Sequence, residues 1–364
     1  MDIYSCSTCG KVFPMTDRHW ICECGSPFEL IPAPRFDAGS IESKGRTLWR
    51  YRSFLPIRSQ DNIVSLGEGM TPLVPFGPHA PRVLLKLDFT SPTGSFKDRG
   101  ATVLASKLRE LGVQEVLDDS SGNAGAALAA YCARAGIVCH IYTPASHSSG
   151  KMNQIVAYGA HLLPIKGSRQ DTARAALEAA AKTYYASHAH NPLYIEGTKT
   201  AAYELWEQLG GRAPGTVVTP LGQGGLLLGI YKGFWELQQA GYVGSLPRLI
   251  GVQSVACAPV AQAFQRGVSE PLRVEEGATI AEGIKITEPV RGRRILSAIR
   301  ETGGTCVIVS DQEIDEARVE LGHHGFYVEP TSATVLAGFR KLGREYSEAD
   351  EVVLVLTGSG LKSH

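Results

Sequence analysis

Short apolar runs rich in β-branched residues recur along most of the chain, and helical patterns separate them. Runs of this kind, bounded by turn residues, are typical of buried strands. The predicted strands are RVLLKLDF (82–89), VQEVLDD (113–119), IVCHIYTP (137–144), AHLLPIKG (160–167), TVVTPLG (216–222), RLIGVQSV (248–255), TCVIVSD (305–311) and EVVLVLTG (351–358). The predicted helices, alanine-rich or amphipathic, are 124–135, 169–186, 198–209, 225–240 and 331–344.

Alternating strands and helices predict an α/β fold in which helices cover both faces of a mostly parallel sheet. In such folds ligands bind beyond the carboxyl ends of the strands, where the amides of the following helix point outward. We therefore look for function in the loops that connect a strand to the next helix.

Composition narrows the classes of partner. The chain has 364 residues, of which 43% are hydrophobic, enough for two to three globular domains. Lys plus Arg and Asp plus Glu both number 36, so no net charge attracts nucleic acid or an anionic membrane. The start, MDIYSCSTCG, lacks the basic and apolar regions of a signal peptide, and we expect a cytoplasmic protein.

Four of the eight cysteines lie close together near the start, in a CxxC pair and a CxC pair separated by twelve residues. This spacing predicts a structural zinc site with the ligands Cys6, Cys9, Cys22 and Cys24. Four thiolates leave no open position for chemistry, and a metal-free turn region is the alternative. Tyr4, Phe13 and Trp20 are the predicted core of this small ribbon. The other four cysteines lie in apolar segments and are predicted to be buried thiols.

Four loops that follow predicted strands are poor in bulky side chains: SPTGSFKDRG (91–100), SSGNAG (120–125), LGQGGLLLG (221–229) and TGSGLK (357–362). Such loops allow backbone amides to approach a phosphate or a carboxylate closely. GSFK lacks the GxxxxGK[ST] spacing of nucleotide hydrolases, and GQGGLLLG does not fit the dinucleotide fingerprint, so ATP and NAD are disfavoured.

Lys97 lies where a helix is predicted to begin. The helix dipole and a dry loop favour a neutral amine there, and a neutral amine is a nucleophile. Together with a separate phosphate-binding loop, this pattern points to pyridoxal phosphate (PLP) bound covalently to Lys97. The alternative is a surface lysine paired with Asp98.

The motifs PTGSFKDRGA, SSGNAGAALAAYCARAG, LGQGG, YVEPTSA and LTGSGLK resemble those of the fold type II PLP enzymes of the tryptophan synthase β family. Within that family the threonine synthases are the most similar. The resemblance runs from about residue 60 to the end, and some threonine synthases carry a similar amino-terminal zinc knuckle. It implies two doubly wound α/β domains with PLP in the cleft, after a zinc ribbon over 1–33.

The resemblance implies domains at 34–192 and 193–364, with a mobile part over about 117–192. It assigns Lys97 as the covalent and proton-transferring residue and Asn123 as a partner of the cofactor's phenolic oxygen. The implied phosphate cradle comprises Gly222, Gln223, Gly224, Gly225 and Leu226. The substrate carboxylate would be held by Ser120, Ser121 and Gly122. Thr357 would face the pyridine nitrogen, and a hydroxyl there suits elimination and replacement more than transamination.

Two departures leave the reaction open. Threonine synthases carry NPxRxEGxKT, in which the arginine helps to bind the phosphate of O-phosphohomoserine, whereas this chain reads NPLYIEGTKT with Tyr194 at that position. TIAEGIKI (279–286) is closer to threonine dehydratases and places the acid Glu282 near the expected ring. The remaining groups for a substrate phosphate are Lys97 and three others: Thr93, Ser95 and Lys199.

The expected function is that of a PLP-dependent lyase, most similar to threonine synthase, which converts O-phosphohomoserine and water to threonine and phosphate. The alternatives are dehydration of serine or threonine, β-replacement on a serine derivative such as O-phosphoserine, and a non-catalytic binding protein with this fold. Arg99 is a candidate for binding a substrate anion or for pairing with Asp98. His188, His190, His323 and His324 are expected in loops or at the surface. The resembling enzymes are usually homodimers.

Overall fold

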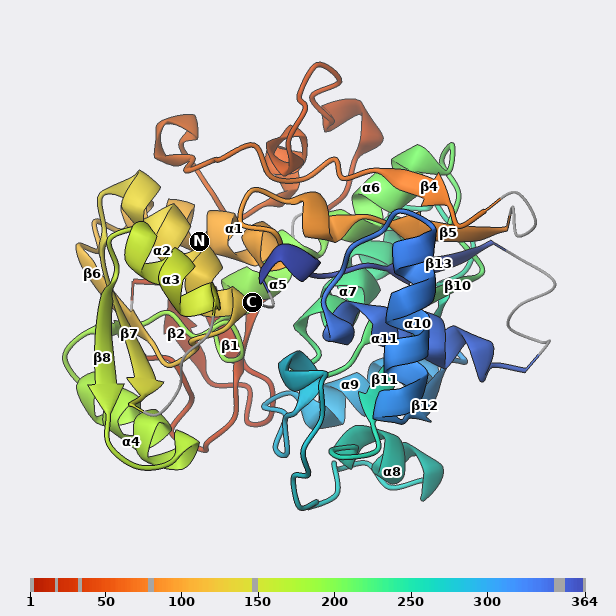
Figure 1. The fold of residues 1–364 in the computed structure, drawn as a ribbon. Helices are drawn as coiled ribbons and strands as arrows, with labels where there is room; N and C mark the ends of the chain where they lie inside the picture. Colours follow the sequence, from red (N-terminus) through yellow and green to blue (C-terminus); the bar gives the residue numbers. More distant parts are fainter. Residues whose placement is uncertain are drawn as a thin grey trace. The chain divides into compact units, whose positions relative to one another are not determined.

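The computed structural model describes residues 3–16, 19–31, 35–77, 82–145, 150–343 and 351–362. The chain divides into two compact units. Unit 1 comprises residues 1–68, 97–198 and 363–364, and unit 2 comprises residues 69–96 and 199–362. The colours along the ribbon in Figure 1 show that each unit combines segments that are distant in the sequence.

Unit 1 contains a four-stranded parallel sheet in the order β8-β7-β6-β9. Its strands are β6 (Glu115–Asp118), β7 (Val138–Pro144), β8 (His161–Ile165) and β9 (Tyr184–Tyr185). Successive residues of a strand point to opposite faces. Val116 joins a buried cluster with residues of α1 and α2, whereas Leu117 joins a cluster with residues of α4. The helices of this unit are α1 (Lys97–Glu110), α2 (Asn123–Ala135), α3 (Gly150–Ala157), α4 (Arg169–Ala179) and α5 (Pro192–Thr198).

A small antiparallel ribbon precedes this sheet in unit 1. Its strands β1 (Ile3–Cys6), β2 (Val12–Pro14) and β3 (Phe28–Ile31) pair in the order β2-β1-β3. The Phe28 ring packs against Tyr4 and Phe13, with centroid distances of 5.7 and 5.0 Å. Trp20, the third predicted core residue, packs instead against Tyr185 of β9 and against His190, which follows β9 in the sequence. Between ribbon and α1 lie the short 3-10 helices Ala38–Ser40, Leu48–Phe54 and Gln60–Asn62.

Unit 2 contains a six-stranded sheet in the order β12-β11-β10-β13-β5-β4, which is parallel except for β4. Its strands are β4 (Leu73–Pro75), β5 (Val83–Lys86), β10 (Thr216–Pro220), β11 (Arg248–Ser254), β12 (Thr305–Val309) and β13 (Val352–Val355). Its helices are α6 (Thr200–Gln208), α7 (Gly225–Gln239), α8 (Pro259–Gln265), α9 (Gly292–Glu301), α10 (Asp311–His323) and α11 (Pro330–Arg340). Its 3-10 helices are Asp88–Thr90, Glu282–Ile284 and Gly360–Lys362.

The predicted α/β class with parallel sheets is confirmed. The division of the chain differs from the predicted domains 34–192 and 193–364, because residues 69–96 belong to unit 2. The physical reason is the pairing of β5 with β13, which brings an early strand beside a late one. The predicted boundary at residues 33 and 34 lies outside the described residues.

One predicted helix ends early. The pattern predicts a helix over 169–186, but α4 ends at Ala179 and β9 occupies Tyr184–Tyr185. Ser168 caps α4 in a capping box with Asp171, which fixes its start. The two tyrosines are buried and pair with β6, where aromatic residues fit a pleated surface better than a helix end.

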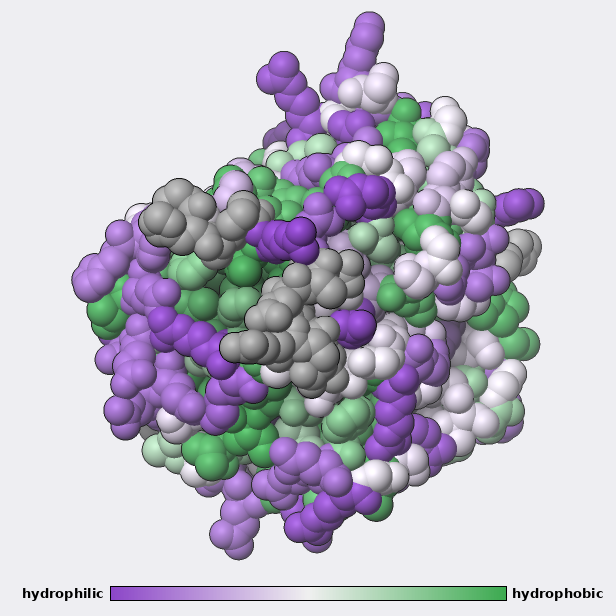
Figure 2. Space-filling view, turned by 90° about the vertical axis from the view of Figure 1, so that its right-hand side faces the viewer, coloured by the Kyte–Doolittle hydropathy of each residue, from purple (hydrophilic) through white to green (hydrophobic). Residues whose placement is uncertain are grey.

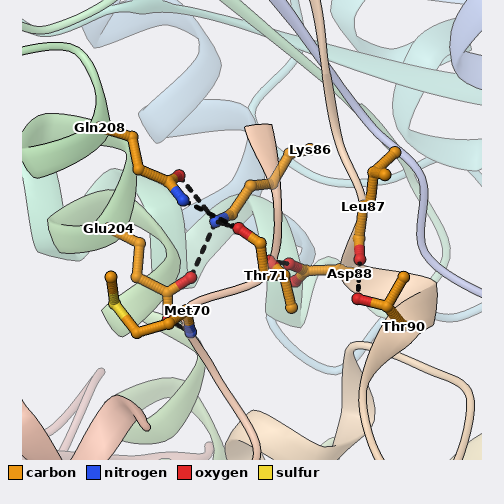
Figure 3. A network of polar contacts seen from close by, with 8 residues as sticks. All are labelled: Met70, Thr71, Lys86, Leu87, Asp88, Thr90, Glu204 and Gln208. Carbon is orange, nitrogen blue, oxygen red and sulfur yellow. Dashed lines mark hydrogen bonds and ion pairs between the residues drawn. The ribbon is translucent and has the colours of Figure 1, made fainter. Parts of the chain in front are cut away.

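A buried ionic network joins α6 to the β4–β5 edge of unit 2 (Figure 3). Lys86 donates from Nζ to the carbonyl oxygen of Thr71 at 2.7 Å, to Glu204 Oε2 at 2.8 Å and to Gln208 Oε1 at 2.9 Å. The Lys86 and Glu204 side chains are both fully buried. Glu204 also accepts a hydrogen bond from the backbone of Met70, at 2.7 Å. A buried charge pair is tolerated when further hydrogen bonds satisfy both groups, as they do here.

Hydrophobic side chains also reach the surface. On the face in Figure 2, hydrophobic residues are interspersed among hydrophilic ones. Within the described ranges, no helix is both long and apolar enough to cross a bilayer.

Candidate active site

Lys97 is the first residue of α1, as the sequence predicts for a helix start. Burial lowers the pKa of its ammonium to about 7, although the nearby carboxylate of Asp118 acts in the opposite direction. Near neutral pH a large share of Lys97 is therefore the neutral, nucleophilic amine. Asp98 and Arg99, which follow it, are both fully buried, so neither lies at the surface.

Two titratable residues lie near Lys97: Asp118, which sequence reasoning missed, and His188, which it expected in a loop or at the surface. Asp118 ends β6, and burial followed by the charge of Asp119 raises its pKa. His188 follows β9, and burial followed by the charge of Lys97 holds its pKa well below the usual range. Asp118 Oδ2 and His188 Nδ1 are buried and lack a hydrogen-bond partner among the described residues. The signal for Asp118 was its place at the end of a predicted strand.

Tyr194 occupies the position where threonine synthases carry an arginine. It lies in α5, and its ring packs against Gly100 of α1, where a Cβ atom would be 1.9 Å from Tyr194 Cδ1. The Tyr194 hydroxyl is buried with no hydrogen-bond partner among the described residues. Burial, and then the negative charge of Asp118, raise its pKa. This position therefore supplies a neutral phenol and no cation.

The proposed carboxylate loop connects β6 to α2 in unit 1. Ser120, Ser121 and Gly122 are half-buried, and Asn123 begins α2 immediately after them. The first helical turn has outward backbone N–H groups that suit an anion. The structure thus places this loop, Lys97 and Asp118 in one unit.

In unit 2 the other proposed residues lie at one edge of the sheet. The strands β10, β13 and β5 are parallel neighbours, so their carboxyl ends meet at the same edge. The loop Gly222–Leu226 follows β10, Thr357 follows β13, and the loop 91–96 follows β5. Three loops that are far apart in the sequence are thereby brought together.

The Gly222–Leu226 loop leads directly into α7, a helix of 15 residues. Gly224 precedes the helix with φ +75°, a conformation that favours glycine. The side chain of Gln223 accepts a hydrogen bond from the Val290 backbone at 3.1 Å. The backbone amides at the start of α7 are therefore the groups that fit a phosphate.

The segment after β13 is bonded to the loop that precedes Lys97. Phe96 donates from its backbone to the carbonyl oxygen of Thr357 at 2.9 Å, and Ser359 donates to Gly94 in the same way at 2.9 Å. Thr357 in turn donates from its backbone to Ser332 Oγ at 2.7 Å. The residue assigned to the cofactor ring is thus linked to the residue directly before Lys97.

Ser95 and Lys199 differ in whether the polar atom of the side chain already has a partner. Ser95 is fully buried, and its Oγ has no hydrogen-bond partner within the described part of the chain. Lys199 is also buried, but its Nζ is 3.1 Å from Glu236 in α7. Glu236 further contacts Lys232 and the Tyr203 hydroxyl. The Lys199 ammonium is already used in this ion pair, so we no longer place it at the substrate phosphate.

The remaining sequence candidates are Glu282, four histidines and the four later cysteines. The segment Glu282–Ile284 passes beside Gly222, where a Cβ atom would be 3.0 Å from the Gly283 carbonyl oxygen. Glu282 itself is exposed. His323 and His324 are exposed, as predicted, whereas His188 and His190 are half-buried in a turn. The four later cysteines, Cys132, Cys139, Cys257 and Cys306, are buried as predicted.

The four amino-terminal cysteines form a separate cluster in the ribbon. Their sulfur atoms all lie within 4.8 Å of one another, with Cys6 and Cys24 at 3.4 Å and Cys9 and Cys22 at 3.6 Å. Four sulfurs at 2.3 Å around a tetrahedral ion would be roughly 3.8 Å apart. Burial opposes ionisation of Cys6, but the backbone N–H groups of Cys9 and Thr8 outweigh it and lower the pKa to about 6.

Each unit, taken by itself, contains groups of the kind that bind part of PLP. Lys97 supplies a nucleophilic amine, the start of α7 supplies amides for a phosphate, and Ser95 supplies a buried hydroxyl. Residues 64–358 match the family model described as pyridoxal-phosphate dependent enzyme. The chain belongs to this family.

Sequence relatives of this PLP-dependent enzyme are threonine synthases. The one from Methanocaldococcus jannaschii is 35% identical over 98% of this chain and 92% of its own length. The one from Methanosarcina acetivorans is 35% identical over 98% and 91%, and that from Synechocystis is 38% identical over 86% and 82%.

Solved structures of other enzymes share the fold. A threonine deaminase from T.th. has a TM-score of 0.64 and 28% identity, covering 76% of this chain and 87% of its own. Maize serine racemase has a TM-score of 0.69 and 21% identity, covering 80% and 88%, and it supports the fold alone. The chain is therefore a PLP-dependent lyase with a small amino-acid substrate.

Proposed function

We propose that this enzyme converts O-phosphohomoserine and water to threonine and phosphate. The observation that carries the proposal is the similarity to threonine synthases over 98% of the chain, ribbon included. PLP, when bound, withdraws electrons from the substrate carbons and so makes their protons acidic. The residues of this chain then have three tasks: to bind the substrate, to move protons, and to release the phosphate.

Lys97 is the proposed proton carrier. Its pKa of about 7 lies close to neutral pH, where a group both accepts and returns a proton efficiently. In the proposed sequence Lys97 Nζ takes protons from Cα and Cβ, the Cγ–O bond to phosphate breaks, and water adds its hydroxyl at Cβ. Protons returned to Cα and Cγ complete threonine, and the remaining proton of water goes to the released phosphate, so the atoms of substrate and water are all accounted for.

The binding roles follow the loops of each unit. Ser120, Ser121 and Gly122 are proposed to hold the substrate carboxylate, and Asn123 is proposed to contact the cofactor's phenolic oxygen. The amides from Gly222 to Leu226 are proposed to bind the cofactor phosphate. Thr357 offers a neutral hydroxyl to the ring nitrogen, which leaves the nitrogen without a full positive charge and favours elimination over transamination.

The substrate phosphate is proposed to bind the loop before Lys97. Thr93 and Ser95 are buried there, and the Ser95 hydroxyl has no partner among the described residues. Hydroxyl and amide donors bind a phosphate less tightly than the two parallel hydrogen bonds of an arginine. We therefore expect a higher KM than an arginine at position 194 would give.

The deciding experiment is incubation of the purified, PLP-loaded enzyme with O-phosphohomoserine. Threonine and phosphate should form in equal amounts, and the Lys97→Ala variant should form neither. Borohydride treatment should attach the cofactor to Lys97 in the wild type and leave it removable from the variant. Absence of phosphate release from O-phosphohomoserine would refute the proposed substrate.

A second candidate is dehydration of serine or threonine. Tyr194 in place of the arginine favours it, as does the structural similarity to a threonine deaminase at 28% identity. The same purified enzyme should then release 2-oxobutanoate from threonine, or pyruvate from serine. A β-replacement on O-phosphoserine would instead require an added nucleophile, so a panel with and without sulfide separates these outcomes.

We further propose that the ribbon binds one structural zinc ion. The support is the sulfur geometry, four thiols within 4.8 Å of one another in a CxxC and a CxC pair. Elemental analysis of the wild type should find one zinc ion per chain. The double variant with Cys9→Ser and Cys24→Ser should contain none. The homodimer and the cytoplasmic location also remain predictions. Sedimentation analysis, which measures the mass of the particle in solution, tests the homodimer.

A further inference from the structure

The ribbon contacts both faces of β9, which is an edge strand of the unit 1 sheet. On one face, Tyr184 belongs to the same buried cluster as Tyr4 and Phe28 of the ribbon. On the other face, the Tyr185 ring meets Trp20 edge to face, with centroids 5.3 Å apart and planes at 87°. Side chains of the ribbon thus pack on both faces of this edge strand.

Trp20 makes a second contact of the same kind. Its ring meets that of His190 edge to face, with a centroid distance of 4.8 Å and an interplanar angle of 89°. Each edge-to-face aromatic pair adds to the stabilisation that burial alone gives. Trp20 also packs on the cluster that contains Leu117, the β6 residue directly before Asp118. The indole of Trp20 therefore contacts both the Tyr185 ring and the side chains around it.

Tyr185 connects this contact to the end of β6. Tyr185 pairs with Leu117 in the sheet, and its hydroxyl donates to Asp119 Oδ1 at 2.8 Å. The other carboxylate oxygen of Asp119, Oδ2, lies 2.6 Å from Arg169 Nη2 of α4. Both oxygens of this buried carboxylate are thus held, one of them by a residue that the ribbon covers.

Asp119 is followed directly by the loop Ser120–Gly122. The loop packs closely on the helix that it leads into, since a Cβ atom at Gly125 would be 1.7 Å from the Ser120 carbonyl oxygen. Because Ser120 packs this tightly on α2, we expect that a displacement of Asp119 would move the loop Ser120–Gly122 as well. The path from Trp20 to Ser120 consists of direct contacts within unit 1.

We propose that the ribbon is part of the substrate-binding machinery, with Trp20 and Tyr185 as positioning residues that hold the carboxylate loop through Asp119. This inference rests on the proposed function for the identity of the ligand, an amino-acid carboxylate. It gives the amino-terminal cysteine motif a role in the reaction beyond its own stability.

The test compares hydrogen exchange of the peptide 117–126 and steady-state kinetics in the full-length, cofactor-loaded enzyme. Tyr185→Phe keeps the ring and removes the hydrogen bond to a charged group, so exchange of this peptide should rise by roughly tenfold. KM for O-phosphohomoserine should rise by about the same factor while kcat changes by less than about threefold. Trp20→Ala should shift exchange in the same direction.

Tyr231→Phe is the matched control, because it also removes a tyrosine hydroxyl from a carboxylate, that of Glu301 in unit 2. It should leave exchange of 117–126 unchanged. If Tyr185→Phe and Trp20→Ala match this control in the exchange of 117–126, the ribbon does not position the loop and the inference is overturned. Exchange is measured without substrate, so failure of O-phosphohomoserine as a substrate would not affect this result.

Discussion

Lys362 donates a hydrogen bond from its Nζ to the carbonyl oxygen of Thr93 at 2.6 Å. Only 9% of Lys362 is exposed, and its Cδ lies 3.0 Å from where a Cβ atom of Gly94 would be. A lysine after the last strand therefore packs on the loop that leads to Lys97. With the backbone bonds at Phe96 and Ser359, it fastens this loop in unit 2.

Replacing Lys362 by Met should loosen this loop. The variant keeps the aliphatic stem and loses a charged donor, so the free energy of unfolding should fall by about 1.5–3 kcal/mol in chemical denaturation. Amide exchange at Phe96 should also quicken. Lys341→Met is the control, because its ion pair with Glu313 is exposed and should contribute less than about 1 kcal/mol. Equal effects of the two changes would contradict the role given to Lys362.

The ionisation of Lys97 in the cofactor-free enzyme provides a second prediction. The rate of reductive methylation of Lys97 should reach half its maximum near pH 7, because only the neutral amine reacts. Asp118→Asn should move this midpoint to lower pH, since the Asp118 charge raises the Lys97 pKa. His188, the other titratable neighbour, is neutral in this range because its own pKa is strongly lowered. A midpoint near pH 10 would contradict the burial of this amine.

The same shift has a consequence for stability with a defined sign. The Lys97 pKa is lower in the folded protein than in the unfolded chain, whose lysine pKa is about 10.4. Between these values the unfolded chain binds more protons, so Lys97 makes the free energy of unfolding rise with pH across this window. In the cofactor-free enzyme, Lys97→Met should flatten this rise, as measured by urea titrations between pH 7 and roughly pH 10.

Two buried tyrosines should respond oppositely to loss of their hydroxyls. Tyr194→Phe removes a buried hydroxyl that has no partner among the described residues, so stability should be unchanged or higher by up to about 1 kcal/mol. Tyr131→Phe removes a hydrogen bond of 2.8 Å to Glu68 Oε2 and should cost about 1–3 kcal/mol. Thermal unfolding of the two variants compares them. A clear loss in Tyr194→Phe would show that its hydroxyl is bonded after all.

The pair of Lys86 and Glu204 predicts strong coupling in a double-mutant cycle (Figure 3). Lys86→Met leaves a buried carboxylate without its cation and should lower the free energy of unfolding by about 3–5 kcal/mol. Lys86→Met combined with Glu204→Gln should recover part of this loss, because no charge is then left uncompensated. Additive losses in the double variant would contradict a direct buried pair.

Local patterns in the sequence predicted most strands of both sheets and the loops after them. The motif around Lys97 and the start of α7 were identifiable because each follows a β-branched run and contains small residues. The pairing of β5 with β13 was not predictable in this way, because it joins residues 83 and 352. Sequence periodicity carries no information on which distant strands pair.

Side-chain surroundings were the least predictable part of the site. The sequence does not show that Asp118 and His188 lie near Lys97, because an acid or a histidine looks the same in a sequence whether it faces solvent or a lysine. Lys199 is predicted as a substrate ligand, and its ion pair with Glu236, 37 residues away, is a contact that no local pattern reveals. Trp20 is predicted in the ribbon core because it lies between the cysteine pairs, whereas its partners Tyr185 and His190 are distant in the sequence.

The position of β13 in unit 2 determines when this unit can fold during synthesis. β13 is formed by Val352–Val355, yet it lies between β10 and β5 in the middle of the sheet. β4 and β5 are synthesised within the first quarter of the chain. The central strand β13, with which β5 pairs, is synthesised much later. Without β13, β10 and β5 lack the strand that pairs with both of them, so the six-stranded sheet is complete only after residue 355 has been synthesised.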